Sequence, residues 1–283
     1  MIMSDNDLGQ LQDWLGRQER CEAIITPQMF DAYQATLAPH LWESEGAAPP
    51  GLHWCLAPSP ATASMAELGE DGHPRRGGFL PPVLLPRRMW AGGEVETLAP
   101  LPIGKPIQRL STIRDIRFKE GRSGKLCFVT VEHELSCEGV LAIRERQDIV
   151  YRAPAEPGAT PAGGPERVGE LEHWVETPPT LLMRYSALTF NAHRIHYDLP
   201  YATDVEGYQG LVVHGPLQAS LLFNLAARHA GRVPARFAYR GQVPLIAGKV
   251  FRAAVSWKEQ GDSLQAWTQD ADGNLNMEAS ASC

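Results

Sequence analysis

The sequence contains few cysteines and no hydrophobic run long enough to cross a bilayer. Its 283 residues include 5 cysteines without a C-x-x-C pair, so neither a disulfide framework nor a cysteine metal site is expected. A transmembrane helix needs roughly 20 consecutive apolar residues, and none are present. The acidic N-terminal stretch lacks the basic start and apolar core of a signal peptide. We therefore expect a cytoplasmic chain with reduced thiols.

Positive charge is also scarce. Lysine and arginine number 26 against 33 acidic residues, for a net charge of -7, and no basic stripe is interleaved with aromatic residues. These features argue against a nucleic-acid surface. Dinucleotide-binding fingerprints, phosphate-loop patterns and heptad arrays are absent as well. The remaining composition, 43% hydrophobic and 21% charged, is typical of a globular protein, and the length favours two domains.

The first half of the chain has helical patterns followed by strand patterns. Leucines recur at helical spacing between residues 8 and 15, and a Thr-Pro start predicts a second helix over residues 26–37. The GEDGHPRRGG sequence at 69–78 is typical of an exposed loop. From residue 92 to 152, polar and apolar side chains alternate between GRSG and EG turns, which predicts an antiparallel meander.

A Pro/Gly/Ala-rich segment, 153–166, has the composition of a flexible connection. We place the domain boundary there, giving an N-terminal domain over 1–155 and a C-terminal domain over 156–283. In the second domain, residues 180–188 are interpreted as a short strand. The polar turn FNAHRIHYD follows at 190–198.

A buried helix is predicted after this turn. Pro216 suits a first helical turn, Gly231 suits its end, and the residues between them are apolar nearly all round. Four segments with period-two alternation follow at 235–246, 249–260, 262–273 and 274–282. These patterns predict an α+β fold in which an antiparallel sheet wraps one central helix.

Two segments of the second half, FNAHRIHYDLPYA (190–202) and GLVVHGPLQASLL (210–222), resemble the MaoC-type enoyl-CoA hydratases and dehydratases. The LPPVLLPRRMWAGGEVE stretch at 80–96 is similar to the substrate-side domain of two-domain members that hydrate mesaconyl-C4-CoA or itaconyl-CoA. The resemblance implies two tandem hot-dog domains, each an antiparallel sheet wrapped around a central helix. It also implies an active site in the C-terminal domain and a substrate and CoA groove, without a catalytic turn, in the N-terminal domain.

The polar turn departs from the family pattern, which usually runs Gly-Asp-x-Asn-Pro-x-His. Aligning the final histidine with His196 puts Asn191 at the aspartate and His193 at the asparagine. An asparagine cannot act as a base at neutral pH. The acidic residue two positions after the final histidine is retained as Asp198, and the most similar subclass carries Asn-x-His. We therefore interpret the site as a variant and not as an inactive one.

Hydration of a thioester-conjugated double bond needs proton transfer and donors for the thioester oxygen. His196 is the candidate proton-transfer group, because its ordinary pKa lies near working pH. Asn191 would position water, and His193 would share proton transfer or orient His196. The N–H of Gly215, at the start of the buried helix, would bind the thioester oxygen. In the structural alternative, Asn191 caps a helix, the histidines are satisfied polar groups and Gly215 only eases a turn.

Five further residues are candidates for substrate binding. Arg184 and Arg194 flank the turn and could anchor CoA phosphates or a carboxylate. In PRRMW at 86–90, the arginines, above all Arg88, and Trp90 are predicted to line the groove, with one arginine gripping a substrate carboxylate. His214 is assigned to the surroundings of the substrate, as a packed or hydrogen-bonded neighbour and not as a catalyst.

Three functions stay open at this stage. The first is a hydratase that adds water reversibly to a short branched or dicarboxylic enoyl-CoA of the mesaconyl-C4-CoA or itaconyl-CoA type. The second is an acyl-CoA thioesterase on the same fold, and the third is a non-catalytic acyl-CoA binding protein. The expected partner is an acyl-CoA thioester, with no nucleic acid and no membrane, and the sequence is compatible with a homo-oligomer.

No metal and no cofactor besides the CoA of the substrate is expected. A metal site built from His193, His196 and His214 ranks low because their neighbours supply no obvious carboxylate. The hydration reaction also needs no Lewis acid.

Overall fold

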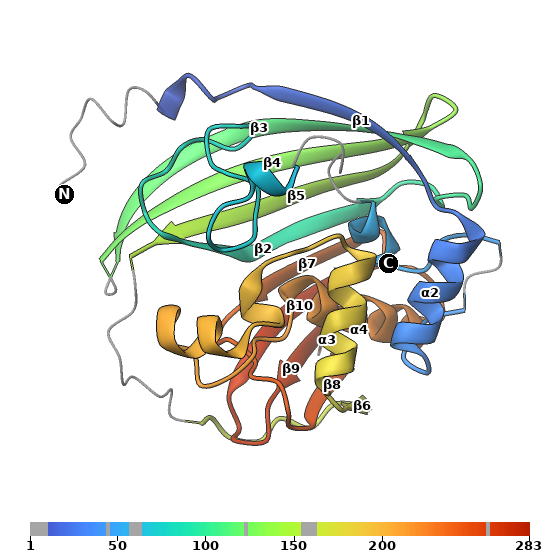
Figure 1. Ribbon diagram of the computed structural model, residues 1–283. Coiled ribbons are helices and arrows are strands. Elements are labelled where there is room, and N and C mark those ends of the chain that lie inside the picture. The colour runs from blue at the N-terminus through green and yellow to red at the C-terminus, as the bar shows by residue number, and fades with distance from the viewer. Residues whose placement is uncertain (1–10, 44–45, 57–63, 122–123, 154–162, 259–260) are drawn as a thin grey trace.

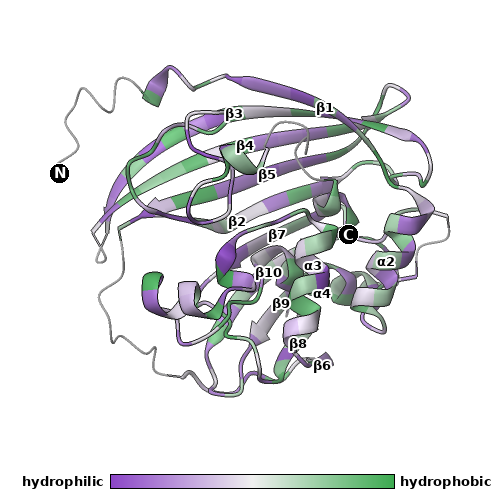
Figure 2. Cartoon of the chain, viewed as in Figure 1, coloured by the Kyte–Doolittle hydropathy of each residue, from purple (hydrophilic) through white to green (hydrophobic). Residues whose placement is uncertain are grey.

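The computed structural model describes most of the chain, namely residues 11–43, 46–56, 64–121, 124–153, 163–258 and 261–283. The helix expected over 8–15 falls partly outside these residues, and its described part is only a short helical turn. An unexpected strand, β1 (Gln18–Ile24), follows it and exposes every second residue. β1 is largely hydrophilic (Figure 2) and pairs only with β3, as suits a sheet edge.

The ten strands of the described residues form one antiparallel sheet (Figure 1) in the order β1-β3-β4-β5-β2-β7-β10-β9-β8-β6. The two halves of the chain meet where β2 pairs with β7. The strands of the first half after β1 are β2 (Arg87–Thr97), β3 (Pro106–Gly121), β4 (Gly124–Cys137) and β5 (Val140–Arg152). Those of the second half are β6 (Leu171–Val175), β7 (Arg236–Gly241), β8 (Phe251–Trp257), β9 (Ser263–Gln269) and β10 (Leu275–Ser282).

The buried helix predicted in the second half is α4 (Gly215–Ala230). Every residue from Leu217 to Ala227 is buried, and Gly231 ends the helix in the left-handed conformation. The helix packs on β8, β9 and β10. Its polar N-terminus therefore has a fixed place relative to the sheet, which confirms the expected arrangement of a sheet around one central helix.

Residues 179–188 correct a sequence-based interpretation. They form the helix α3 (Pro179–Leu188) and not a strand. Leu182 and Tyr185, one turn apart, are its buried residues, and Pro179 occupies a first-turn position. The strand of this region lies earlier, at β6, which pairs with β8. An apolar run this short fits the spacing of a helix and also that of a strand, so tertiary packing determines which one forms.

The first half contributes a shorter helix, α2 (Pro27–Leu37), capped as expected by the Thr26 hydroxyl, which accepts from the Met29 N–H. α2 packs against α3. Farther along the sheet, side chains of the segment 79–85 pack on β3, β4 and β5 in a second cluster around Tyr151.

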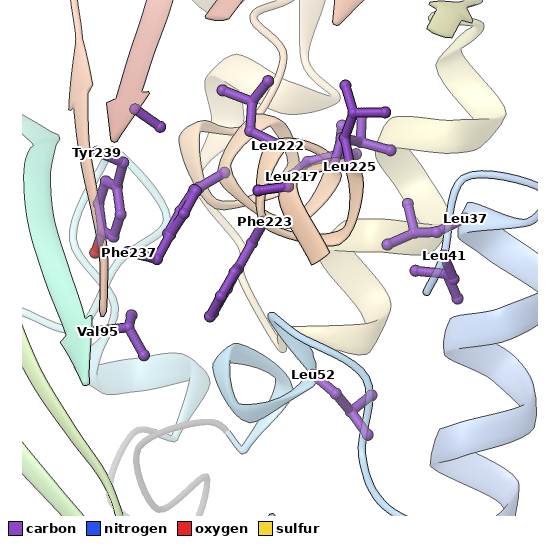
Figure 3. Packing of buried hydrophobic residues seen from close by; sticks show 14 of the residues in the cluster. Leu37, Leu41, Leu52, Val95, Leu217, Leu222, Phe223, Leu225, Phe237 and Tyr239 are labelled. Atoms are coloured by element: carbon purple, nitrogen blue, oxygen red, sulfur yellow. The ribbon is translucent and has the colours of Figure 1, made fainter. Parts of the chain in front are cut away.

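The main hydrophobic core runs through both halves of the chain. Figure 3 shows Leu37 and Leu52 of the first half around the α4 side chains, with Val95 of β2 beside Phe237 and Tyr239 of β7. The expected linker over 153–166 lies largely outside the described residues, and the division at residue 155 stays a prediction. Among the described residues, no helix is long and apolar enough to span a membrane.

Candidate active site

A large cavity of about 1780 Å³ lies between the two halves. The first half contributes residues of β2, β4 and β5 and of the segment 65–80. The second half contributes the polar turn, the start of α4 and the end of β7. Of the sequence-predicted site residues, those that line the cavity are Asn191, His193, His196, Gly215, Arg88 and Trp90.

His196 is held in one orientation by the backbone. It lies at the end of a short 3-10 turn, Arg194–His196, and its Nδ1 is 2.7 Å from the carbonyl oxygen of Val212. That contact requires the proton on Nδ1, so Nε2 keeps its lone pair. Burial lowers the pKa of His196 to about 4, although the Val212 hydrogen bond opposes the shift. The imidazole is therefore a neutral acceptor at physiological pH.

The ring of His214 packs against the ring of His196. The two rings are stacked with centroids 3.6 Å apart, and His214 Nε2 lies 2.8 Å from the Ser186 hydroxyl. His214 is fully buried and does not line the cavity, so within the structure it is a packed and hydrogen-bonded neighbour of the site. Because His214 directly precedes α4, the stack connects the His196 ring to the start of that helix.

Asn191 and His193 combine a structural role with exposure to the cavity. The Asn191 side-chain oxygen accepts from the His193 backbone N–H at 2.9 Å. The structural alternative, in which Asn191 caps the following turn, is therefore partly correct. Burial lowers the pKa of His193 to about 2, with further lowering by His73 and His196. No described residue forms a hydrogen bond to the His193 ring nitrogens.

Gly215 is the first residue of α4, so its N–H has no acceptor inside the helix. Its lack of a side chain is sterically required, since a Cβ there would lie 2.7 Å from Cε3 of Trp90. Trp90 in turn stacks on Tyr239, with ring centroids 4.3 Å apart. The indole thus forms a wall of the cavity directly against the helix N-terminus, where an oxygen with developing negative charge would be stabilised.

The 69–78 loop is not simply exposed, and its placement is a correction. The Arg194 N–H donates to the Asp71 carbonyl at 3.0 Å. A Cβ on Gly72, whose φ is +86°, would lie 1.9 Å from the Ala192 carbonyl oxygen. The loop therefore packs directly on the polar turn and brings His73 to the cavity. Its Gly and Pro content signalled a loop but could not indicate what the loop contacts.

The Asp71 and His73 side chains form a pair beside the polar turn. His73 Nδ1 lies 3.1 Å from an Asp71 carboxylate oxygen, and the His73 backbone N–H donates to the other oxygen at 3.0 Å. Burial would raise the pKa of Asp71, but His73 and the nearby Arg88 outweigh it and hold the pKa well below its usual range. Burial lowers the pKa of His73 to about 4.

The two arginines of PRRMW have different surroundings. Arg88 lines the cavity, with Nη2 3.9 Å from Asp71 and a buried Nε that has no partner among the described residues. Arg87, also expected in the groove, is not a cavity residue. It pairs instead with Glu206 at 3.1 Å. Of the two, only Arg88 is placed to meet a ligand.

Arg184 and Arg194, the candidate anchors of CoA phosphates or a carboxylate, do not line the cavity. Arg184 is exposed on α3 and donates to the Ala35 carbonyl of α2. Arg194 pairs with Asp198, at 2.7 Å from Nη2, and lies over the Tyr201 ring. These contacts show that both side chains are held by the protein, and nothing in the sequence could have distinguished them from Arg88.

Two of the three histidines considered as metal ligands are engaged otherwise, His196 with Val212 and His214 with Ser186. Among the described residues, ligand atoms of Asp71, His73 and His193 lie within 4.8 Å of one another. The Asp71 carboxylate already accepts two hydrogen bonds from His73. The neighbouring Arg88 guanidinium would also disfavour a second cation there.

We expect the free energy of unfolding to fall as the pH drops from about 6.5 to about 5. The pKa values of His73, His193, His196 and His214 are all lowered, chiefly by burial, from the ordinary 6.5. Histidines of the unfolded chain would take up protons in this window while the folded protein would not. Stability is therefore fully present above pH 6.5 and is lost as the pH falls toward the folded pKa values, which are about 4 for His73 and His196 and lower still for His193.

Denaturant unfolding curves measured at several pH values would check this expectation. The buried His53 and the half-buried His133 also have lowered pKa values and add to the same loss of stability at low pH. A free energy of unfolding that does not change across the window would contradict it.

Comparison with known proteins adds independent findings. The family model of hydroxyacyl-thioester dehydratase type 2 matches residues 51–247. The mesaconyl-C(4)-CoA hydratase of Chloroflexus aurantiacus is 44% identical over 271 residues, covering 94% of this chain and 95% of that protein.

Two solved structures show the fold. A MaoC-like dehydratase has a TM-score of 0.69 at 15% identity, covering 96% of this chain and 98% of its own. A Mycobacterium tuberculosis protein described as a double hotdog fold has a TM-score of 0.57 at 12% identity, covering 95% and 96%. The predicted double hot-dog architecture is thereby confirmed.

The agreement extends from sequence to fold. The family model covers most of the chain, the Chloroflexus relative is similar over nearly its whole length, and the fold is that of MaoC-like dehydratases. The chain therefore belongs to the hydroxyacyl-thioester dehydratase type 2 family and is a hydratase/dehydratase.

Proposed function

We propose that this enzyme adds water reversibly across the double bond of a short branched or dicarboxylic enoyl-CoA. Mesaconyl-C4-CoA and itaconyl-CoA are the first substrates to test, because the Chloroflexus relative is named for mesaconyl-C(4)-CoA. The observation that carries the proposal is the juxtaposition of a neutral imidazole at His196 with the free N–H of Gly215. Both residues line the cavity, and the His196–His214 stack connects the imidazole to the residue that precedes Gly215.

The chemistry follows from these two groups. His196 Nε2 takes a proton from water as the water oxygen bonds to the β carbon, and the π electrons move toward the thioester oxygen. The Gly215 N–H and the α4 dipole stabilise that oxygen. The proton then passes from His196 to the α carbon, so that one water has been added. Dehydration is the reverse.

Asn191 and His193 have supporting roles in this proposal. The Asn191 side-chain oxygen is occupied by the His193 N–H, which leaves the amide nitrogen to donate toward water in the cavity. The His193 ring lies edge-on to that of His196, with centroids 5.4 Å apart. It would limit the orientations of the bound water.

One assay tests the proposed function. Purified protein is incubated with a panel of saturated and unsaturated acyl-CoAs while the absorbance of the conjugated thioester and a mass gain of one water are followed. Hydration of unsaturated members supports the proposal. Release of free CoA without a hydroxyacyl-CoA would show a thioesterase instead, and tight binding without turnover would show a binding protein.

We expect Arg88→Ala to lower kcat/KM for mesaconyl-C4-CoA by about tenfold or more relative to crotonyl-CoA, because only the dicarboxylic substrate loses a guanidinium partner. The support is that Arg88 faces the cavity with a buried Nε that has no partner. Arg75→Ala is the matched control, since Arg75 also lines the cavity but is exposed and donates to Leu68. Equal losses on both substrates for Arg88→Ala would refute recognition of the carboxylate.

The remaining features of the proposal are general. The reaction needs proton transfer and oxyanion stabilisation, which side chains and backbone supply, so we propose that no cofactor takes part besides the CoA of the substrate. The five unpaired cysteines support a reducing compartment such as the cytoplasm. We retain the domains 1–155 and 156–283 and a homo-oligomer as predictions.

A further inference from the structure

The polar turn offers the cavity no carboxylate. Asn191 is not ionisable, and Asp198 is engaged by Arg194 and by the Tyr201 N–H and does not line the cavity. The titratable groups that the turn presents to the cavity are therefore His193, His196 and Tyr197. Any carboxylate that supports proton transfer in this cavity therefore belongs to another segment of the chain.

The Asp71–His73 pair is held against this turn from the first half of the chain. Because His73 Nδ1 contacts the carboxylate at 3.1 Å, the proton lies on that nitrogen. Nε2 therefore keeps a lone pair, and it has no hydrogen-bond partner among the described residues. The His73 ring lines the cavity and lies 4.2 Å, centroid to centroid, from the His193 ring.

The contacts around the pair indicate more than a structural clamp. The loop is anchored by backbone groups, through the Asp71 carbonyl and the close approach of Gly72 to Ala192. None of these anchors needs the His73 imidazole or the Asp71 carboxylate. The His73 imidazole, which the anchoring does not require, lines the cavity with the Asp71 carboxylate aligned behind it, and this arrangement calls for a chemical explanation.

We propose that His73 is a second catalytic residue, which accepts a hydrogen bond from the reacting water, and that Asp71 is its positioning residue. This inference rests on the proposed hydration and assigns part of the active site to the first half of the chain. Asp71 holds the imidazole in the tautomer whose Nε2 faces the substrate. It also stabilises positive charge that develops on His73, as carboxylate–histidine pairs do in other enzymes.

The step balances as follows. One water proton goes to His196 and from there to the α carbon. The water oxygen bonds to the β carbon, and the second proton stays on that oxygen as the new hydroxyl. During the attack this second O–H donates to His73 Nε2, whose own Nδ1–H donates to Asp71. His73 therefore increases the electron density on the attacking oxygen without keeping its proton.

The decisive experiment compares His73→Gln and Asp71→Asn with the wild type on the enoyl-CoA that the wild type hydrates best. We expect His73→Gln to lower kcat by roughly a hundredfold or more with little change in KM. Asp71→Asn keeps an acceptor for His73 but removes the charge, and we expect it to lower kcat by roughly tenfold or more.

The pH dependence of kcat distinguishes a positioning role of Asp71 from a role in folding alone. The groups that face His73 are Asp71, His193, His196, Arg88 and Arg76. Asp71 is the only one of them that favours the protonated imidazole, so Asp71→Asn should move the acidic limb of kcat to lower pH. A purely structural role for Asp71 would leave that limb in place.

A second histidine–carboxylate pair serves as the matched control. His229 and Glu170 lie 2.7 Å apart on the surface, away from the residues that line the cavity. His229→Gln and Glu170→Gln should leave kcat unchanged.

The outcomes are distinguishable. Active wild type together with near-normal kcat in a folded His73→Gln variant would overturn this inference alone. A wild type that hydrates no enoyl-CoA would overturn the proposed function and this inference with it. If His73→Gln does not fold, the Asp71→Asn variant is the deciding test. A normal kcat and an acidic limb at the wild-type pH would then refute a catalytic role for the Asp71–His73 pair.

Discussion

Replacing His196 should abolish most turnover while leaving the fold intact. The imidazole is the acceptor whose free Nε2 faces the cavity, because Nδ1 is committed to Val212 at 2.7 Å. Loss of a positioned general base lowers the rate by roughly a hundred- to ten-thousand-fold, or about 3 to 5 kcal/mol. Initial rates of enoyl-CoA hydration by His196→Ala, compared with the wild type, measure this loss.

His196→Asn is the sharper variant of the same test. His196 is buried, so alanine would leave the Val212 carbonyl without its donor and could destabilise the turn. An asparagine amide can still donate to that carbonyl but supplies no base. We expect the same loss of turnover with an unchanged melting temperature. A folded His196→Asn enzyme with near-normal turnover would remove the central residue of the proposed mechanism.

The second large effect concerns the N–H of Gly215. A simple substitution is ambiguous, because any Cβ at this position would clash with Trp90, at 2.7 Å from Cε3. The clash can be removed by Trp90→Ala in the background. Gly215→Ala/Trp90→Ala then keeps the N–H, whereas Gly215→Pro/Trp90→Ala deletes it. We expect kcat of the proline variant to be lower by roughly a hundred- to a thousandfold, the usual effect of one lost oxyanion donor.

The backbone tolerates this proline. Gly215 is the first residue of α4, where a proline is favoured because its N–H has no helical acceptor. His214 has φ −57° and ψ 135°, an extended conformation that suits the residue before a proline. Equal kcat values for the two double variants would show that Gly215 serves only the close approach of Trp90. The melting temperatures of both variants provide the folding control.

Local signals in the sequence were sufficient for most elements of the fold. Thr26 and Pro27 mark the start of α2, and Gly231 marks the end of α4. The all-round apolar surface of α4 predicted its burial. Strict alternation identified the long strands β3, β4 and β5. These features depend on neighbouring residues along the chain, so a single sequence carries them.

The same signals were weaker where elements are short. Residues 180–188 were interpreted as a strand but belong to the helix α3, since an apolar run of this length fits the spacing of a helix and of a strand. β1 has only 7 residues, and its edge position becomes visible only through its pairing with β3. In both regions, contacts with distant segments decided the outcome.

The polar turn, the helix start after it and the resemblance that both carry indicate the type of chemistry without a structure. Which side chains meet depends on tertiary contacts. The tertiary structure separated Arg88, which faces the cavity, from Arg87, paired with Glu206. It also brought His73 to a turn more than a hundred residues away, next to His193. Local periodicity cannot encode such proximity, because it arises from loop packing and from the pairing of β2 with β7 across the two halves.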